Sequence, residues 1–353
     1  SVVQGNLTYI HLPSIKFNGS VGPVPAALAS DESKEEHFLI PGLHYISPEF
    51  GNARFGLSVV VPAGLSKRWN GFAKTFAEEF TLKTVEINPT VGFKLTDTLS
   101  IGGGIRGVYT SGVVKSIGQA PATAAFRDME GTSFDFGYNL ALHFKPTDNF
   151  DLALTYRSKV ELTVEGDAEL GIMGTDAFDY DGGASIDVPI PAAFSLAIAA
   201  DMDDATTFEF VLERTFWDAW ESLDFDYDDP IHPALVGDFD DPAPRNWANS
   251  TAYRLGVTHQ WDNDLTLMAG FAIDEAPNPK ANTGFELPES DGKIYSFGAM
   301  YQVSPKLSVG GAVLYTQRKR LRIDAADANI NGINGRFDDA GALLVTLGLD
   351  YKL

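Results

Sequence analysis

The chain has 353 residues, 44% of them hydrophobic, and carries a formal net charge of −22 from 48 acidic and 26 basic residues. This charge argues against nucleic acid as a partner, because phosphates require a basic surface. The absence of cysteine excludes disulfides and thiolate chemistry. The sequence has no run of about 18 apolar residues, so it predicts no transmembrane helix.

Alternating apolar and polar positions recur along the chain and predict fourteen strands. In chain order these are residues 2–17, 37–47, 54–64, 80–96, 99–114, 133–145, 150–165, 184–200, 206–227, 249–261, 265–276, 293–303, 306–323 and 341–353. Odd-numbered strands are followed by long loops and even-numbered strands by turns of a few residues. An even strand count with long extracellular loops and short periplasmic turns is typical of outer-membrane barrels.

The seventh predicted strand, residues 150–165, shows the pattern most clearly. Its even positions are apolar except for Ser158, and its odd positions are polar except for Ala153. A period of two is typical of a strand with one apolar and one wet face. The strand is also longer than the ~9–11 residues that a tilted strand needs to cross a bilayer. We therefore expect its even positions to face lipid and its odd positions to face a wet lumen.

These patterns predict an all-β fold, a transmembrane antiparallel β-barrel of 14 strands. We expect one domain, residues 1–353, with both termini on the periplasmic side of a bacterial outer membrane. A soluble sandwich with many strands would not separate its loop lengths so regularly.

Several segments resemble the FadL-type family (OmpP1/FadL/TodX-like), the long-chain fatty-acid and hydrocarbon transporters of Gram-negative outer membranes. The resemblance covers nearly the whole chain and rests on residues 55–65 (FGLSVVVPAGL), 82–109, 154–170, 188–199 and the tail from about 253. It implies a channel for uptake of hydrophobic molecules by passive diffusion, with sideways exit through a gap at a kinked third strand. We expect no enzymatic activity and no cofactor.

Two features depart from the family pattern. The family's small plug precedes the first strand and contains an Asn-Pro-Ala motif, and nothing of the kind precedes Val2. We predict that the full-length precursor carries a plug ahead of Ser1. The chain also ends in Leu353 rather than in phenylalanine, although Tyr351 keeps the aromatic pattern.

Basic side chains on the predicted lumen phase are candidates for binding a fatty-acid head group. Arginine pairs bidentately with a carboxylate, and strand geometry puts Arg106 and Arg157 near mid-depth. The candidate ligand-binding residues are Arg157, Arg106, Lys159, Arg254, Arg318 and Arg320. The competing interpretation, more common for any single residue, is that they neutralise lumen acids such as Glu86 and Glu161.

Other features leave alternatives open. Pro62 and Gly64 mark either the kink of a lateral opening or the plain end of the third strand, because proline removes a ladder donor. Trp69 and Phe72 form either a hydrophobic landing patch or, as we prefer, part of an interfacial aromatic belt. The acidic loops lack the spacing of a calcium loop, so we expect a solvated surface and no metal site.

Two other functions compete with the uptake of hydrophobic molecules. A general diffusion porin would pass small sugars, and an outer-membrane lipid hydrolase would need a nucleophile with a base in reach. None of the six histidines lies in a His-x-Ser or HExxH pattern. We expect a monomer that contacts the lipid bilayer, lipopolysaccharide and a hydrophobic small molecule or fatty acid.

Overall fold

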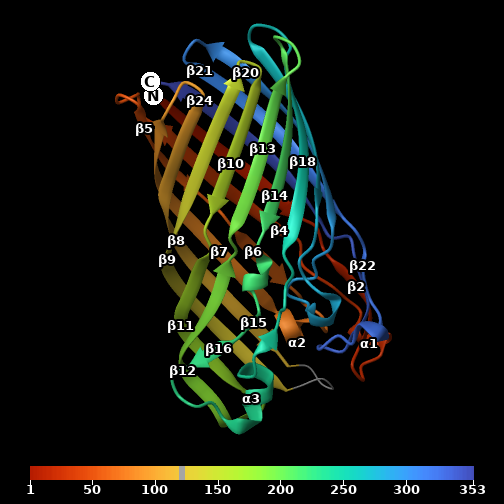
Figure 1. Cartoon of the computed structure of the whole chain (residues 1–353). Helices are drawn as coiled ribbons and strands as arrows, with labels where there is room; N and C mark the ends of the chain where they lie inside the picture. The colour runs from red at the N-terminus through yellow and green to blue at the C-terminus, as the bar shows by residue number, and fades with distance from the viewer. Residues whose placement is uncertain (119–123) are drawn as a thin grey trace.

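The computed structural model describes residues 1–118 and 124–353 and shows a tall β-barrel with a folded cap at one end (Figure 1). The strand order around the barrel is β1-β4-β5-β7-β8-β9-β10-β13-β14-β18-β19-β20-β21-β24. Strand β1 pairs with β24 on one side and with β4 on the other, so the sheet closes on itself. The prediction of a closed antiparallel barrel of fourteen strands is confirmed.

The barrel strands have the following bounds. They are β1 (Val2–Leu12), β4 (Glu36–Ile46), β5 (Ala53–Val60), β7 (Glu79–Lys94), β8 (Leu99–Ile117), β9 (Ala125–Thr147), β10 (Phe150–Arg157), β13 (Ala193–Asp201), β14 (Thr206–Thr215), β18 (Ser250–Gln260), β19 (Leu265–Asp274), β20 (Gly292–Ser304), β21 (Leu307–Arg318) and β24 (Gly341–Lys352). Beyond a break, the wall continues as β6 (Gly64–Arg68), β11 (Val160–Ile172), β12 (Thr175–Ile190) and β16 (Phe225–Tyr227).

The two termini lie side by side at the end of the barrel that carries the short turns (Figure 1). There the backbone N–H of Leu353 donates to the carbonyl of Ser1 at 3.1 Å. The long connections whose residues the structure describes run to the opposite end, as the loop lengths predict. Because short turns face the periplasm in such barrels, the cap is extracellular.

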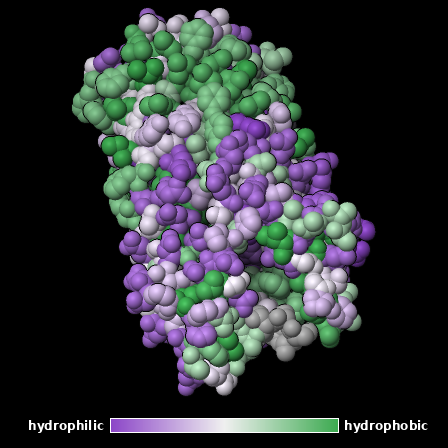
Figure 2. Space-filling model, turned by 60° about the horizontal axis from the view of Figure 1, so that its bottom comes forward, coloured by the Kyte–Doolittle hydropathy of each residue, from purple (hydrophilic) through white to green (hydrophobic). Residues whose placement is uncertain are grey.

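The outer face changes character along the barrel axis. In the half with the termini, large apolar side chains point outwards, among them Phe136 and Leu347, which are 66% and 68% exposed. Figure 2 shows hydrophobic residues gathered at this end and hydrophilic residues over much of the other. Exposed apolar surface of this extent needs lipid around it, so this half spans the membrane. None of the described helices has the length and apolar character that a membrane-spanning helix requires.

The lipid face predicted for residues 150–165 is correct only for its first half. The strand breaks between β10 and β11, and its pairing with β9 shifts by one residue across the break. Beyond the break the apolar side chains are buried inside the wall and pack with Val108. These residues are Val160, Leu162 and Val164. A one-residue shift moves every following side chain to the other face, so the extracellular part of the strand is apolar inside and polar outside.

The cap is a small folded lobe rather than a set of independent loops. It contains a four-stranded sheet in the order β22-β23-β2-β3, a strand pair β15–β17 and several short helices. The bounds are β2 (Lys16–Val21), β3 (Asp31–Glu32), β15 (Ser222–Leu223), β17 (Ala243–Pro244), β22 (Leu321–Ile323), β23 (Ile333–Asp338), α1 (Ala26–Ala29), α2 (Lys74–Ala77), α3 (Pro233–Phe239) and the 3-10 helices Trp217–Ala219, Lys280–Asn282 and Ala325–Asp327. Strands predicted for residues 2–17, 206–227 and 306–323 are therefore each divided between wall and cap.

Trp69 and Phe72 lie in the core of this lobe. They are 0% and 6% exposed and pack with Phe17, Phe285 and neighbouring side chains. The indole N–H of Trp69 donates to the carbonyl of Phe285 at 3.0 Å. Both interpretations of these aromatics, landing patch and membrane belt, are wrong, because distant segments fold over them.

Candidate functional site

The third barrel strand is interrupted at Pro62 and resumes. Strand β5 ends with Val60 opposite Glu86, and β6 begins with Gly64 opposite Lys83. Three residues of the third strand therefore face two residues of β7, which is a bulge, the position in a sheet that tolerates proline.

Thr84 replaces the lost ladder bonds from inside the wall. Its hydroxyl accepts from the Ala63 N–H at 3.2 Å and donates to the Ala63 carbonyl. The strand thus bends at Pro62 without ending at the loop, and Thr84 holds the bend in place.

Beside this bend the backbone pairing with β4 is interrupted. Strand β4 pairs with the third strand only through residues 43–46, against residues 56–59. No ladder joins residues 37–42 of β4 to residues 60–67 in the part of the chain that the structure describes. We call this unpaired stretch the lateral window.

Side-chain and main-chain contacts close the extracellular end of the lateral window. The guanidinium of Arg68 donates to the buried carboxylate of Glu36 at 2.8 and 2.6 Å. The N–H of Lys34 donates to the carbonyl of Arg68 at 2.8 Å. The lateral window therefore ends at the Arg68 contacts on its extracellular side and at the four-residue ladder between β4 and β5 on its periplasmic side.

A cavity of about 1130 Å³ lies behind the lateral window, in the extracellular half of the barrel. Both edges of the window line it, through Phe38 and Leu39 on β4 and residues 61–67 on the third strand. Its wall includes an apolar row from β12, formed by Ile186, Val188 and Ile190. The volume slightly exceeds the ~300–1,000 Å³ of most ligand pockets, which suits a long or variable apolar molecule.

Three tryptophans lie on the cavity wall that the cap contributes. Trp247 contacts Trp220 with 4.5 Å and Trp217 with 4.9 Å between ring centroids. The indole N–H of Trp220 is shielded from solvent and has no hydrogen-bond partner among the described residues. Indole rings offer a large apolar surface with one polar atom, so this wall fits an amphipathic ligand.

The cations of the cavity differ in how they are neutralised. Arg254 pairs with Glu213 at 2.9 Å, and Arg318 pairs with Glu289 at 2.8 Å. Lys67 on β6 is only 6% exposed, and its amine has no ion pair or hydrogen bond within the described residues. A buried charge is normally paired because desolvation is costly. The Lys67 ammonium is therefore a buried cation of the cavity lining without a counter-charge in direct contact, whereas Lys83, which also lines the cavity without an ion pair among the described residues, is exposed.

Lys67 lies outside the membrane-spanning half. Strand β6 pairs with residues 79–83 of β7, beyond Val85, the last outward apolar side chain of that strand. Burial lowers the pKa of the Lys67 amine, whereas the more distant carboxylates of Glu36 and Glu289 raise it. The amine thus has acids nearby but none in direct contact.

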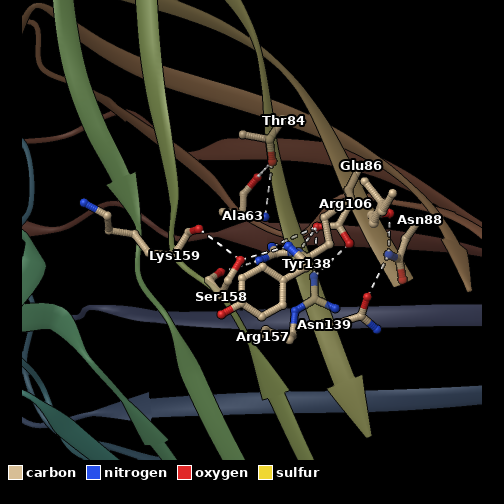
Figure 3. Close-up of polar contacts among 11 residues, drawn as sticks. Ala63, Thr84, Glu86, Asn88, Arg106, Tyr138, Asn139, Arg157, Ser158 and Lys159 are labelled. Carbon is tan, nitrogen blue, oxygen red and sulfur yellow. Dashed lines mark hydrogen bonds and ion pairs between the residues drawn. The ribbon is translucent and has the colours of Figure 1, made fainter. Parts of the chain in front are cut away.

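Arg106 and Arg157 converge on the buried carboxylate of Glu86 (Figure 3). Arg106 Nε lies 3.0 Å and Arg106 Nη2 2.9 Å from Glu86 Oε2, and Arg157 Nη2 lies 2.9 Å from both oxygens. Arg106 also donates to the carbonyl of Ser158 at 2.7 Å. The cluster links β7, β8 and the break between β10 and β11. Its arginines neutralise a lumen acid, as the competing interpretation expects.

The remaining candidates lie away from the cavity lining. Lys159 points away from the Glu86 cluster and bonds to Glu161 (Figure 3). The lumen phase expected for Lys159 is wrong, because the break at Ser158 inverts the alternation. Arg320 follows the end of β21, is 63% exposed and pairs with Asp338 in the cap.

The chain matches the family described as "Outer membrane protein transport protein (OMPP1/FadL/TodX)" over residues 1–352. The chain belongs to the OMPP1/FadL/TodX family. Its placement in the bacterial outer membrane follows, as the strand pattern predicts. Outer membrane protein P1 of Haemophilus influenzae is 20% identical over 389 residues, covering 99% of this chain and 83% of that protein. The long-chain fatty acid transport protein of Salmonella typhi is 23% identical over 326 residues, covering 81% and 71%.

Solved OMPP1/FadL/TodX structures share the fold. A Pseudomonas aeruginosa FadL homologue superposes with a TM-score of 0.85 at 21% identity, covering 99% of this chain and 90% of that one. The Pseudomonas putida toluene transporter TodX gives 0.74 at 16% identity, with the same coverage. At these identities the similarity shows only that the fold is shared. The ligand must therefore be inferred from this chain's own residues.

Proposed function

We propose that this OMPP1/FadL/TodX-family channel takes up amphipathic molecules with a carboxylate head and an apolar tail, long-chain fatty acids first among them. The observation that carries the proposal is the unpaired ammonium of Lys67 in a largely apolar cavity that reaches the lateral window. A carboxylate would supply the counter-charge that the protein does not. The long-chain fatty acid transport protein of Salmonella typhi, a relative of this chain, supports the same class of ligand.

The arrangement supports a route in three stages. The tryptophan wall of the cap holds the apolar tail when it leaves water. The head group then pairs with Lys67, and the tail lies along the apolar row of β12. Because the cavity lining includes both window edges, the tail has a path to the lipid beside β4. Movement follows the concentration gradient, since hydrophobic transfer into lipid is favourable.

The experiment that tests this proposal is oleate binding to purified protein, wild type against Lys67→Met. A charge-assisted contact contributes about 1.5–3 kcal/mol, which is roughly one to two decades in affinity. We expect Lys67→Met to lose that much for oleate and little for a neutral alkane of the same length. Lys83→Met is the matched control, because Lys83 also borders the cavity but is exposed. Equal weakening by both variants would contradict the proposal.

A general diffusion porin remains the alternative channel. The folded cap lies at the extracellular end of the barrel, which disfavours free passage of sugars. Flux of small sugars into liposomes that contain the protein separates the two functions. We expect no flux above that of empty liposomes.

We further propose that the chain transports its ligand without chemical change. One contact resembles part of a hydrolase site: Nδ1 of His44 lies 2.8 Å from the hydroxyl of Ser58. A triad needs a third group that orients the histidine, and no carboxylate lies within 4.0 Å of His44 in the two described ranges. Hydrolysis of a fatty-acyl ester that disappears in Ser58→Ala would contradict this inference.

Other expectations stay predictions. Arg157 and Arg106 remain candidates for a second head-group contact; the Arg157 side chain is 40% exposed although it pairs with Glu86, whereas the Arg106 side chain is 1% exposed. The monomeric state, the contact with lipopolysaccharide and a plug in the precursor likewise await measurement.

A further inference from the structure

We propose that His11, Glu35 and His37 form a binding site for a divalent transition metal of the zinc type at the extracellular corner of the lateral window. The sequence gives no metal spacing among its histidines. Pairing of β1 with β4 sets His11 directly opposite His37, and Glu35 precedes β4. Imidazole together with carboxylate suits zinc and its neighbours.

The distances fit one shared metal ion. The carboxylate Oε2 of Glu35 lies 3.5 Å from Nε2 of His11 and 3.9 Å from Nε2 of His37. One ligand atom from each residue lies within 4.8 Å of the others. Ligands bonded at about 2.0–2.2 Å to a tetrahedral ion are roughly 3.3–3.6 Å apart, so small side-chain movements suffice. Three protein ligands leave a fourth position for water.

Two further observations point to a ligand at this place. Nε2 of His11 is shielded from solvent yet has no hydrogen-bond partner among the described residues. Nδ1 of His37 lies 2.8 Å from the hydroxyl of Tyr9. When Nδ1 of His37 carries the proton and donates it to Tyr9, its Nε2 lone pair is free for a metal. An outer partner of this kind orients a histidine ligand and fixes its tautomer.

The two imidazole rings stack, with 4.9 Å between centroids and 6° between planes. A shared metal requires both rings to turn towards Glu35 about the χ2 bond, which is a soft torsion. The net charge of −22 raises the concentration of cations near the surface. The metal would tie β1 to β4 beside Glu36, the residue that Arg68 holds at the window's end.

Zinc titration of untagged, chelator-stripped barrel in detergent tests the site. We expect one saturable site per chain by calorimetry, and Co²⁺ in place of zinc should give the visible absorption of a four-coordinate ion. His11→Gln and His37→Gln should each abolish the saturable site. Tyr9→Phe should weaken binding about 10–100-fold, as loss of an outer partner does.

His44→Gln is the matched control, since His44 lies on the same strand and contacts Ser58 instead. It should leave zinc affinity unchanged. Heat-dependent gel migration shows whether each variant is a folded barrel. Equal zinc affinity in the His11→Gln/His37→Gln double variant, or no saturable binding by the wild type, would overturn the proposal. If a variant fails to fold, the wild-type protein still tests the proposal. A Co²⁺ spectrum of the wild type without the bands of a four-coordinate ion would also overturn it.

Discussion

Removal of Glu86 should destabilise the barrel more than removal of other lumen carboxylates. Glu86 and Arg106 are each 1% exposed, and Arg157 is the second partner of the same carboxylate. Glu86→Ala leaves Arg106 buried and uncompensated, which costs about 3–5 kcal/mol. Arg157→Ala should cost only about 1 kcal/mol or less, because its side chain is 40% exposed and Glu86 keeps Arg106.

The assay is reversible urea unfolding in lipid vesicles, followed by tryptophan fluorescence, which reports the free energy of unfolding. Glu213→Ala is the matched control, because Glu213 pairs with Arg254 at side-chain exposures of 31% and 41%. We expect Glu213→Ala to cost about 1 kcal/mol or less. If Glu86→Ala costs no more than Glu213→Ala, the assignment of Glu86 as a structural centre is refuted.

Three further predictions concern transport. If Arg157 is a head-group anchor, Arg157→Ala weakens oleate binding by about one to two decades and leaves binding of a neutral alkane unchanged. Equal loss for both ligands would mean that Arg157 serves packing. No loss for either would mean that Arg157 only balances the charge of lumen acids. Deletion of Pro62 leaves two residues of the third strand facing two residues of β7, so it should remove the bulge and narrow the lateral window. Oleate uptake into vesicles should then fall. Unchanged uptake would argue against exit through the lateral window. Burial lowers the pKa of Lys67 below 10.5. Its ammonium should therefore lose charge, and oleate affinity should decline, at a lower pH than an exposed lysine would allow; an affinity that stays flat up to pH ~10 would contradict this.

The barrel itself could be predicted from the sequence because its outer face has one strong constraint. Lipid requires an apolar residue at every second position, so the alternation is visible in strands such as β24 and β9. The lengths of the turns and loops then indicate which end of the barrel faces the periplasm. These signals are local, and the structure confirms them.

The parts that the sequence did not predict depend on distant contacts. Residues 61–63 form a bulge, in which three residues face only two residues of β7. The strand continues after the bulge as β6, so Lys67 lies in a strand rather than in a loop. Lys67 is buried on β6, two positions before Trp69, and the core of the cap joins Trp69 to Phe285, 216 residues later. The solitary Ser158 in the apolar row was the available sign of a break, but it did not show that the faces invert.

The Glu86 cluster was only partly predictable. Arg106, Arg157 and Glu86 were placed on the lumen phase correctly from alternation. Their mutual distances follow from the register of three strands, which the sequence does not specify. Likewise, His11 and His37 are separated by 26 positions and meet only because β1 pairs with β4.

The most direct test of the account is a structure of the protein with oleate that carries bromine at its methyl end. The account predicts the carboxylate at about 2.7–2.9 Å from Nζ of Lys67 and the anomalous bromine signal at the lateral window, beside Leu39 and Pro62. A carboxylate paired with Arg157, with the tail directed along the lumen towards the periplasmic turns and no signal at the window, would contradict it.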